Sequence, residues 1–589
     1  MLIRLFRTLA PLRWEQIVYR PLRVAQYRAY RYFPWLAAGE ARGGAAFSGS
    51  RIELFRGVIR ESFAHLMPPM EEVAPVLADV AANRFTFLNR TIELVDVDWN
   101  RRYEGHLWNY QLHYFGFALP CARAGGEHWR RCRARIESWI EGARPGRSDG
   151  WDAYPISLRV VNWLYAYALI EGAEPDRAFL DRWRGSLHRQ LAFLRRHLEF
   201  HLLANHLLKN VKALVVGGLA FDEREWLETG ERLLWREFDE QVLADGGHYE
   251  RSPMYHAQTL ADLLECAALL RAFGRPVPPR VQVGLPRMAA FLAALTHADG
   301  SLALFNDSAN TPDTRPRPIL EAARRICCAL EPTTDQQPTT QFPQTGYYVW
   351  ASPDGAEKII VDAGPPSVAY NTAHAHCDLL SYELWMAGAP FIVDAGLHGY
   401  GGDPYREYCR STRAHNTVVF DGVEQSEVWG TFRMARRAEL LDADWRVHDG
   451  ALAFRGRYRR YDRNLVHERR IHRTVDGVWT VADCAREGDA RDAVSFLHLH
   501  PSVSARKINA GLIECRIRAC IVFIEPFADD GGEIDIELMT GSSEPVQGWY
   551  FPEFGVARPS PTICLHFRGR ARTGFGYRLV PRAAESSEQ

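Results

Sequence analysis

The sequence predicts a multidomain α and β protein, in which a helical domain is followed by an antiparallel β domain. Up to about residue 330, apolar residues recur at the three- and four-residue spacing of helices, as in residues 158–168 and 260–270. After residue 335, short β-branched and aromatic runs are separated by Asp–Gly turns, as in residues 358–362 and 478–482. Because the two patterns do not alternate along the chain, a parallel βαβ sheet is not expected.

The predicted segments follow one another in order along the chain. Residues 1–100 form an Arg-rich helical segment and lead-in, residues 101–335 the helical domain, and residues 345–580 the β domain. Residues 329–346, rich in Pro, Thr and Gln, are typical of a linker. The polar residues 582–589 are expected to fray. Further strands are expected over residues 390–394, 416–420 and 520–525.

The first 31 residues alternate arginine with leucine and phenylalanine, and two interpretations are open. The segment fits an amphipathic helix on an anionic membrane surface, which would make the protein a peripheral membrane protein. It also fits a solvated helix that docks one face on its own domain, and we favour this second interpretation. The arginines also interrupt every apolar run that a secretory signal would need. We therefore expect a cytoplasmic or membrane-associated protein, with a periplasmic location still open.

The overall charge argues against a nucleic-acid partner. Lys and Arg number 71 and Asp and Glu 72, which gives a net charge of −1. Such a balance provides no overall positive electrostatic field that would attract a polyanion. Binding of an acidic ligand must therefore depend on a local cluster of basic residues. The 11 cysteines are odd in number and widely spread, which indicates reduced thiols rather than a disulfide framework.

Two stretches of the helical region carry residues that are able to do chemistry. In residues 203–221, Asn205, His206 and Lys209 share a helix face and together are able to neutralise a carboxylate. In residues 245–256, Ser252 and Pro253 start a helix and place Tyr255 in its first turn, where a phenol can act as acid or base. The structural alternatives, a helix-end Asn with a core His and a core Tyr, are open for each stretch alone.

Two further stretches lie in the β region. His374 and His376 are two residues apart and point to the same side of an extended segment. A strand ends at Asp394, and an aromatic, Arg-rich loop leads from there to His415. His376, Asp394 and His415 are suitable ligands for a tetrahedral zinc with an open fourth position. Their spacing by itself is no metal motif.

Short sequence blocks from these four stretches, taken in chain order, resemble the heparinase II/III family of polysaccharide lyases and its alginate-lyase relatives. The strongest are NHLLKNVKAL, DGGHYERSPMYH, HAHCDLLSYEL, PFIVDAGLHGY and RSTRAHNTVVFDG. Residues 107–117 and 154–163 are similar to blocks of family members from surface-polysaccharide gene clusters. The resemblance covers roughly residues 100–500. It implies an N-terminal incomplete (α/α) toroid followed by a C-terminal antiparallel β-sandwich, and β-elimination of a uronic-acid-containing polysaccharide.

The resemblance also implies the role of each site residue. Asn205 and His206 would neutralise the uronate carboxylate, and Tyr255 and His374 would act as acid and base. A further family tyrosine matches Tyr400, with Tyr405 and Tyr408 as alternatives. A structural zinc would be held by His376, Asp394 and His415.

The expected partner is an anionic polysaccharide or oligosaccharide. Some heparinases have an acidic residue where this chain has Lys209, and a lysine there favours an anionic substrate. Arg159 and Arg410 are further candidates for substrate contacts. The chain shows no signal peptide, whereas characterised relatives are exported, so a role in exopolysaccharide, capsule or lipopolysaccharide metabolism is expected. The sequence leaves the sugar and the oligomeric state open, a dimer included.

Two other functions are consistent with the same residues. A uronyl C5-epimerase would share the abstraction of the C5 proton, and its product would lack the unsaturated uronate of a lyase. A non-catalytic polysaccharide-binding or assembly factor is expected to have lost catalytic residues, and Asn205, His206, Tyr255 and His374 are all present.

Overall fold

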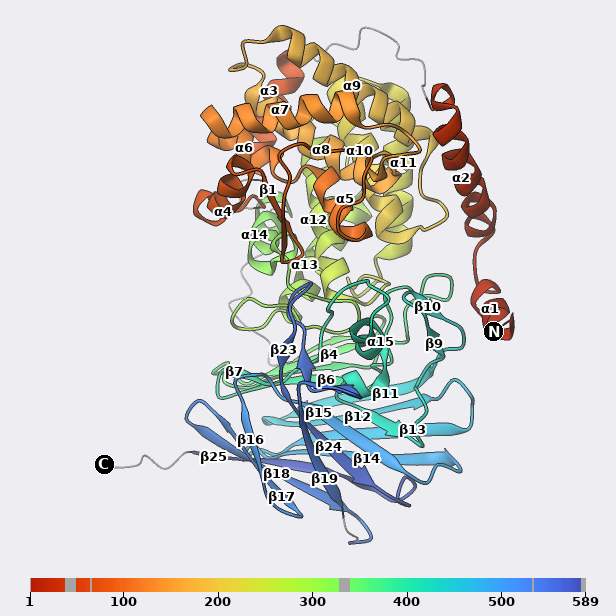
Figure 1. The fold of residues 1–589 in the computed structure, drawn as a ribbon. Coiled ribbons are helices and arrows are strands. Elements are labelled where there is room, and N and C mark those ends of the chain that lie inside the picture. Colours follow the sequence, from red (N-terminus) through yellow and green to blue (C-terminus); the bar gives the residue numbers. More distant parts are fainter. Residues whose placement is uncertain (1, 38–48, 64–65, 328–338, 532–533, 584–589) are drawn as a thin grey trace.

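The computed structural model describes residues 2–37, 49–63, 66–327, 339–531 and 534–583. The helical part of the chain lies on one side of the molecule and the β-sheets lie on the other, with helices α12 and α13 reaching toward the sheets (Figure 1). Among the described residues, no helix combines the length and the apolar character that a membrane crossing needs.

Fourteen α-helices precede the sheets within the described residues. They are α1 (Leu2–Leu9), α2 (Trp14–Tyr32), α3 (Gly49–Glu61), α4 (Met70–Ala81), α5 (His106–Tyr114), α6 (Ala118–Ala124), α7 (Gly126–Gly142), α8 (Ala153–Ile170), α9 (Arg177–Arg196), α10 (Ala204–Phe221), α11 (Arg224–Gln241), α12 (Pro253–Ala272), α13 (Pro279–Ala294) and α14 (Pro316–Cys327). A small hairpin of β1 (Arg84–Phe87) and β2 (Arg90–Glu93) stands between α4 and α5.

The helical domain has an inner and an outer layer. Helices α8, α10 and α12 are buried over most of their length, and α10 packs against both α8 and α12. Helices α7, α9 and α11 bury one face and carry charged residues on the other. This difference follows from the sequence, because a helix that is apolar all round belongs in the interior and an amphipathic helix belongs at the surface. The layering is that of the expected incomplete (α/α) toroid.

Three larger antiparallel sheets lie in the β part of the described chain, together with three two-stranded ones. The first sheet has the order β3 (Thr339–Phe342), β4 (Tyr347–Ala351), β5 (Lys358–Asp362), β6 (Ser381–Met386), β7 (Ala389–Ile392). The largest has the order β11 (Glu439–His448), β12 (Ala451–Arg459), β13 (Leu465–Arg473), β14 (Trp479–Gly488), β25 (Phe575–Ala583), β18 (Cys520–Ala528), β17 (Leu512–Ile517), β16 (Ser504–Asn509). The third has the order β19 (Asp535–Thr540), β24 (Pro561–Phe567), β15 (Ala493–His498), β8 (Val418–Phe420).

One hydrophobic core joins the three sheets. Residues of β5 and β6 pack with residues of β14, β25 and β24, and Trp479, Tyr577 and Leu565 are completely buried there. Short elements lie on the side of the sheets that faces the helices (Figure 1). They are α15 (Pro404–Arg410) and the hairpin of β9 (Val428–Trp429) and β10 (Arg433–Met434).

The predicted fold class is confirmed. The strand expected over 358–362 is β5, and the helix expected to start at Ser252 and Pro253 is α12, whose N-cap Ser252 Oγ accepts the backbone N–H of Tyr255 at 3.2 Å. Most of the predicted linker over 329–346 and most of the predicted tail over 582–589 lie outside the described residues.

Candidate active site

The residues predicted to be catalytic come from both domains and meet where these touch. Asn205 and His206 lie in the first turn of α10, and Tyr255 lies in the first turn of α12. His374 lies in the loop between β5 and β6, and Tyr400 in the loop between β7 and α15. The Tyr255 and Tyr400 hydroxyl oxygens are 2.7 Å apart, so the helical domain and the sandwich share one site.

The backbone is in the left-handed region just before three of the polar segments of the site. Ala204 (φ 49°) precedes Asn205, Arg251 (φ 59°) precedes the cap of α12, and Asn306 (φ 57°) precedes the next residue, Asp307. Such a conformation costs a residue with a β-carbon on the order of 1–3 kcal/mol, and it persists where the surroundings hold it. Strain of this kind is typical of functional sites.

A buried carboxylate, Asp307, organises the centre of the site. Its Oδ2 is 2.8 Å from Nδ1 of His374 and its Oδ1 is 2.7 Å from Nε2 of His376, and Arg406 binds both oxygens. Burial acts to raise the pKa of Asp307, but Arg406 and the two histidines hold it well below its ordinary value. Because an ionised carboxylate only accepts hydrogen bonds, Nδ1–H of His374 donates to Asp307, and Nε2 is the ring nitrogen left free of this carboxylate.

The aromatic ring of Tyr255 lies against His374, with ring centroids 4.0 Å apart. Burial raises the pKa of Tyr255 well above its ordinary value, and Tyr400 and Asp307 add to this. The pKa of Tyr400 is also raised by burial. The guanidinium of Arg406 lies 5.2 Å from the centre of the Tyr400 ring. Both phenols are therefore neutral in the resting protein and are able to donate a proton.

A second acidic group, Glu199, holds His206 at the start of α10. Nδ1 of His206 is 3.3 Å from Glu199, whose carboxylate also accepts a hydrogen bond from Asn210 at 2.9 Å. The His206 ring packs on Tyr154 with centroids 4.4 Å apart. Among the described residues, none forms a hydrogen bond with the side-chain amide of Asn205. Its amide is thus available for a ligand.

Glu250 lies between the two halves of the site. Its carboxylate is 3.9 Å from Nε2 of His374 and accepts a hydrogen bond from Asn371 at 3.0 Å. Burial raises its pKa, while the nearby His374 and His206 act in the opposite direction. Tyr255, His374 and Tyr400 thus lie in mutual contact, and Glu250 is close enough to both His374 and His206 to feel their charge.

The predicted substrate-binding residues have internal partners. Lys209 forms an ion pair with Asp262, its Nζ lying 2.7 Å from the carboxylate, and Lys212 binds the same carboxylate. The positive charge of Lys209 is therefore largely compensated inside the protein.

Arg159 and Arg410 are buried, and the structure corrects the substrate contacts predicted for them. The guanidinium of Arg159 donates to Gln190 and to two backbone carbonyls, and it stacks on the indole ring of Trp139 at 3.9 Å. That of Arg410 donates to the carbonyls of residues 375, 430 and 433. With no exposed donor, each guanidinium stabilises the local backbone.

The three predicted zinc ligands are close together, but their geometry differs from the expected one. Nδ1 of His376 and Nε2 of His415 are buried and have no hydrogen-bond partner. One ring nitrogen of each histidine and a carboxylate oxygen of Asp378 all lie within 4.8 Å of one another. Asp394 instead lies 2.7 Å from the other ring nitrogen of His415, Nδ1. Two imidazoles and a carboxylate in a buried cluster fit a zinc ion, with Asp378 in the place predicted for Asp394.

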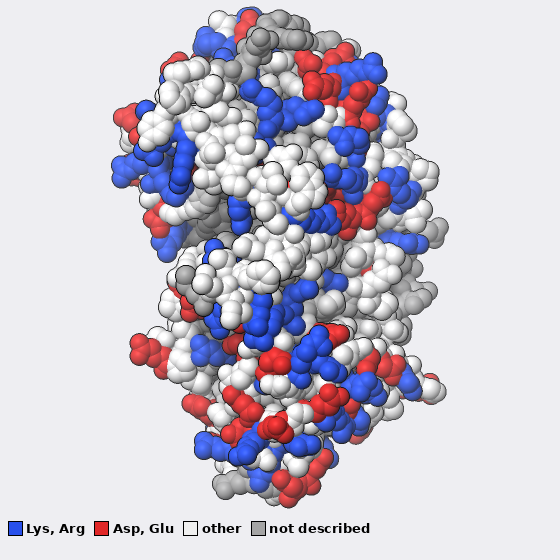
Figure 2. Space-filling model, turned by 90° about the vertical axis from the view of Figure 1, so that its right-hand side faces the viewer, with Lys and Arg blue, Asp and Glu red and all other residues white. Residues whose placement is uncertain are grey.

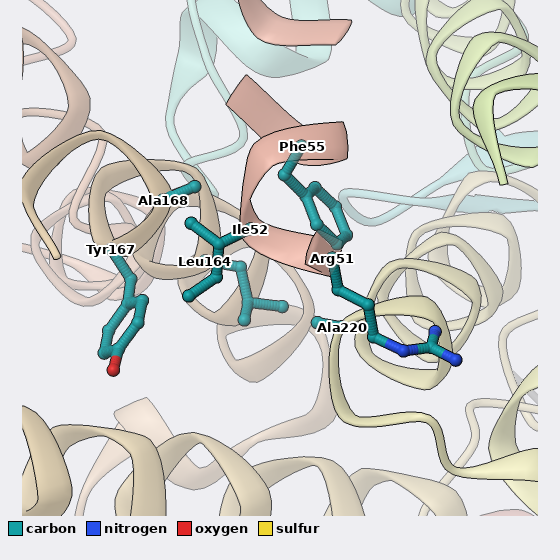
Figure 3. A pocket seen from close by; sticks show the side chains of 7 residues that line it. All are labelled: Arg51, Ile52, Phe55, Leu164, Tyr167, Ala168 and Ala220. Atoms are coloured by element: carbon teal, nitrogen blue, oxygen red, sulfur yellow. The ribbon is translucent and has the colours of Figure 1, made fainter. Parts of the chain in front are cut away.

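A separate pocket lies away from this site. It is small and apolar, and it is bounded by residues of α3, α8 and α10 (Figure 3). Ala220 at this pocket is fourteen residues after His206 on the same helix, a separation of roughly 21 Å at 1.5 Å per residue. The pocket therefore has no part in the arrangement around His374.

Three functional residues were missed in the sequence. Asp307, Arg406 and Glu250 contact or face predicted site residues. Glu250 and Arg406 lie within stretches that the sequence singled out, but nothing in the pattern distinguished them from their neighbours. The one available signal for Asp307 was the polar triplet 306–308, which interrupts a run of apolar residues. Its partners are far apart in sequence, so only folding identifies them.

A helical toroid joined to an antiparallel β-sandwich, with a tyrosine and a histidine at their contact, defines a class of proteins that contains many polysaccharide lyases. Family models for the heparinase II/III N-terminus and for the heparinase II/III-like C-terminal region match residues 74–324 and 334–584. The chain belongs to the heparinase II/III family, as the sequence blocks predicted.

Curated relatives match over part of their length. The heparin-sulfate lyase of Pedobacter heparinus is 26% identical over 297 residues, which are 46% of this chain and 44% of the relative. The heparin-sulfate lyase of Bacteroides thetaiotaomicron is 25% identical over 52% of this chain and 51% of the relative. The FtsZ-localized protein C of Caulobacter vibrioides is 24% identical over 62% of this chain and 58% of the relative. The chain thus spans about half the length of these relatives.

Solved structures share the fold at low sequence identity. The crystal structure of heparinase III has a TM-score of 0.71 at 18% identity and covers 94% of both chains. The heparan sulfate lyase HepC of Pedobacter heparinus has a TM-score of 0.61 at 19% identity, covering 91% of this chain and 88% of that one. These similarities establish the fold over more than nine-tenths of the chain.

Proposed function

We propose that the protein is a polysaccharide lyase that cleaves a uronic-acid-containing polysaccharide by β-elimination. The observation that carries the proposal is the placement of Tyr255 against His374, with the Asp307 carboxylate behind the histidine. Heparin-sulfate lyases among the relatives of the chain support the same reaction class.

The first requirement of the reaction is to acidify the C5 proton of the uronate. That proton lies next to a carboxylate, and its removal produces an enediolate with additional negative charge. Donors placed where this charge develops lower the barrier. The Asn205 amide and the His206 ring at the N-terminus of α10 are suited to this task, because both lie on the first turn and His206 is held by Glu199.

The second requirement is a base and an acid. With Asp307 bound at Nδ1, His374 presents the lone pair of Nε2 and can accept the C5 proton. Tyr255 is neutral and hydrogen-bonded to Tyr400, so its phenol can donate a proton to the O4 leaving group. For a substrate of opposite C5 stereochemistry, Tyr255 would serve as the base instead.

A zinc ion bound to His376, His415 and Asp378 would have a structural role. Bound there, zinc would cross-link the segment that carries His374 to the segment after α15. Asp394 would orient the ring of His415 from its other nitrogen. The proton transfers above need only side chains of the protein.

We further propose a substrate from surface-polysaccharide metabolism, such as an exopolysaccharide, a capsule or a lipopolysaccharide, acted on in the cytoplasm or at a membrane surface. The support is the similarity of residues 107–117 and 154–163 to family members from such gene clusters.

The test is to incubate the purified protein with a panel of uronate polysaccharides in deuterated water. A lyase produces unsaturated uronate ends that absorb in the ultraviolet. A C5-epimerase instead incorporates deuterium at C5 without that absorbance. A protein that binds the polysaccharide and yields neither product would contradict the proposal, and a His374→Ala variant controls for contaminating enzymes.

A further inference from the structure

Helices α1 and α2 contact the rest of the protein through their polar side chains. Arg4 and Arg7 of α1 pair with Glu427, and the hydroxyl of Thr8 accepts a hydrogen bond from the Trp429 indole at 3.0 Å. None of the residues of α1 is buried. As favoured from the sequence, the segment docks on its own chain, but with the face opposite to the one that an amphipathic helix normally buries.

The longer helix α2 repeats this orientation. Its buried residues are Gln16, Arg23 and Tyr30, which recur every seven positions. Each of them forms a polar contact. Gln16 donates to the carbonyl of residue 370, Arg23 donates to the carbonyl of residue 198, and the Tyr30 hydroxyl is 2.8 Å from Nε2 of His197.

The apolar faces of both helices point into solvent. On α1, Leu2 is 80% exposed and Phe6 is 73% exposed. On α2, Trp14 is 64% exposed and Ile17 is 55% exposed. The same helix face continues through residues 18, 21, 22 and 25, which are all exposed. We call this surface the N-terminal apolar stripe; it comprises Leu2, Ile3, Phe6, Leu9, Trp14, Ile17, Val18 and Leu22. Large apolar side chains exposed together on successive helices mark an interaction site.

The charge around the stripe indicates its occupant. Residues 1–37 contain seven arginines and one glutamate. Arg20, Arg28 and Arg31 are exposed next to the apolar positions. The face of the molecule that carries α2 has uncharged side chains over much of its middle with blue side chains beside them (Figure 2). Aromatic and aliphatic residues flanked by arginine are the composition of helices that lie in an anionic lipid interface.

We propose that the N-terminal apolar stripe docks the protein on an anionic membrane surface, with α1 and α2 lying parallel to the bilayer. In this orientation Phe6, Trp14 and Ile17 enter the boundary between headgroups and acyl chains, and the exposed arginines contact lipid phosphates. The polar contacts of Gln16, Arg23 and Tyr30 then hold the folded domains against the membrane. This inference is independent of the proposed catalysis.

Co-sedimentation of the full chain with lipid vesicles tests the proposal. We expect binding to vesicles of 30% phosphatidylglycerol in phosphatidylcholine, with at least tenfold weaker binding to pure phosphatidylcholine and in high salt. The Phe6→Ser/Ile17→Ser double variant should bind at least tenfold more weakly. A matched control, Val95→Ser/Val283→Ser, changes two exposed valines outside the stripe and should bind like the wild type.

A second variant, Arg20→Gln/Arg28→Gln, keeps the test valid if the serine variant fails to fold. It should weaken binding to the anionic vesicles and leave the thermal melt unchanged. Equal binding to neutral and anionic vesicles, or equal binding by the wild type and both stripe variants, would overturn the proposal. A concentration-dependent dimer that Phe6→Ser/Ile17→Ser abolishes, without vesicle binding by the wild type, would assign the stripe to a second copy of the chain instead.

Discussion

Oδ2 of Asp307 lies 2.8 Å from Nδ1 of His374, and this pairing turns the other nitrogen of the histidine toward the region shared by the two domains. The two residues are 67 positions apart in sequence. The carboxylate is completely buried and is bound on its other side by Arg406. The orientation of the proposed base in the sandwich thus depends on a residue of the helical domain, in the loop between α13 and α14.

The first prediction concerns Asp307. Replacing it with asparagine removes the negative charge that fixes the tautomer of His374, so kcat/KM should fall by about 10²–10⁴. The same change leaves the buried guanidinium of Arg406 without its counter-charge, which should destabilise the fold by about 3–5 kcal/mol.

The double variant Asp307→Asn/Arg406→Met separates these two effects. It removes both buried charges, so its melting temperature should recover while activity stays low. Activity and thermal melts of the three proteins provide the check. Recovery of activity together with stability would show that Asp307 serves the fold and not His374.

The second prediction concerns the tyrosine pair. Tyr255→Phe removes only a hydroxyl, so turnover should fall by about 10²–10⁴ while stability changes by about 1 kcal/mol. Tyr400→Phe should have a smaller effect on turnover, because it removes the hydrogen-bond partner of Tyr255 and not the proposed acid. Tyr405→Phe, in the first turn of α15, is the control and should keep most of the activity. A Tyr255→Phe variant with more than half of wild-type turnover would remove this residue from the mechanism.

The third prediction separates the two neighbouring histidines. His374→Ala should lower activity with little change in zinc content or melting temperature. His376→Ala should lower zinc content and melting temperature together, because the imidazole of His376 lies in the cluster with His415 and Asp378. Elemental analysis and melts of both variants are the measurements.

The acidic ligand of the same cluster is tested in parallel. If the geometry is correct, Asp378→Asn should lose zinc more completely than Asp394→Asn. Equal zinc content and equal melts for the His374 and His376 variants would contradict the assignment of one histidine to chemistry and the other to metal. Wild-type protein that binds no transition metal would contradict the zinc site itself.

The fourth prediction concerns the pH dependence of stability. Burial raises the pKa of Asp152 to about 7, and its Oδ2 accepts a hydrogen bond from Tyr110 at 2.6 Å. Because the unfolded value is about 3.9, the protonated carboxyl stabilises the fold below about pH 4, and this contribution is lost as the pH rises through about 7.

Asp152→Asn keeps the acceptor oxygen without the ionisation. The variant should match the wild type near pH 4 and exceed it on the order of 2 kcal/mol at pH 8. Denaturant unfolding at both pH values measures this. A difference between the two proteins that does not change with pH would contradict the assigned ionisation.

Much of the architecture could be predicted from sequence because hydrophobic periodicity is a local property. The change from helical spacing to alternation near residue 335 separates α14 from β3, and Ser252 with Pro253 marks the start of α12, whose cap needs only its own first turn. The ordered blocks around Asn205, Tyr255 and His374 were likewise sufficient to indicate the family, since each block is a short contiguous run.

The sequence could not predict which side chains contact one another, because these contacts form between residues that lie far apart along the chain. Arg159 and Arg410 had the right charge for a polyanion, but folding buries both and supplies them with internal acceptors. Asp307 became central only when the chain brought it between His374, His376 and Arg406. The outward direction of the α1 and α2 apolar faces was also decided in three dimensions, because an amphipathic pattern defines two faces and only the contacts of the folded chain determine which one meets solvent.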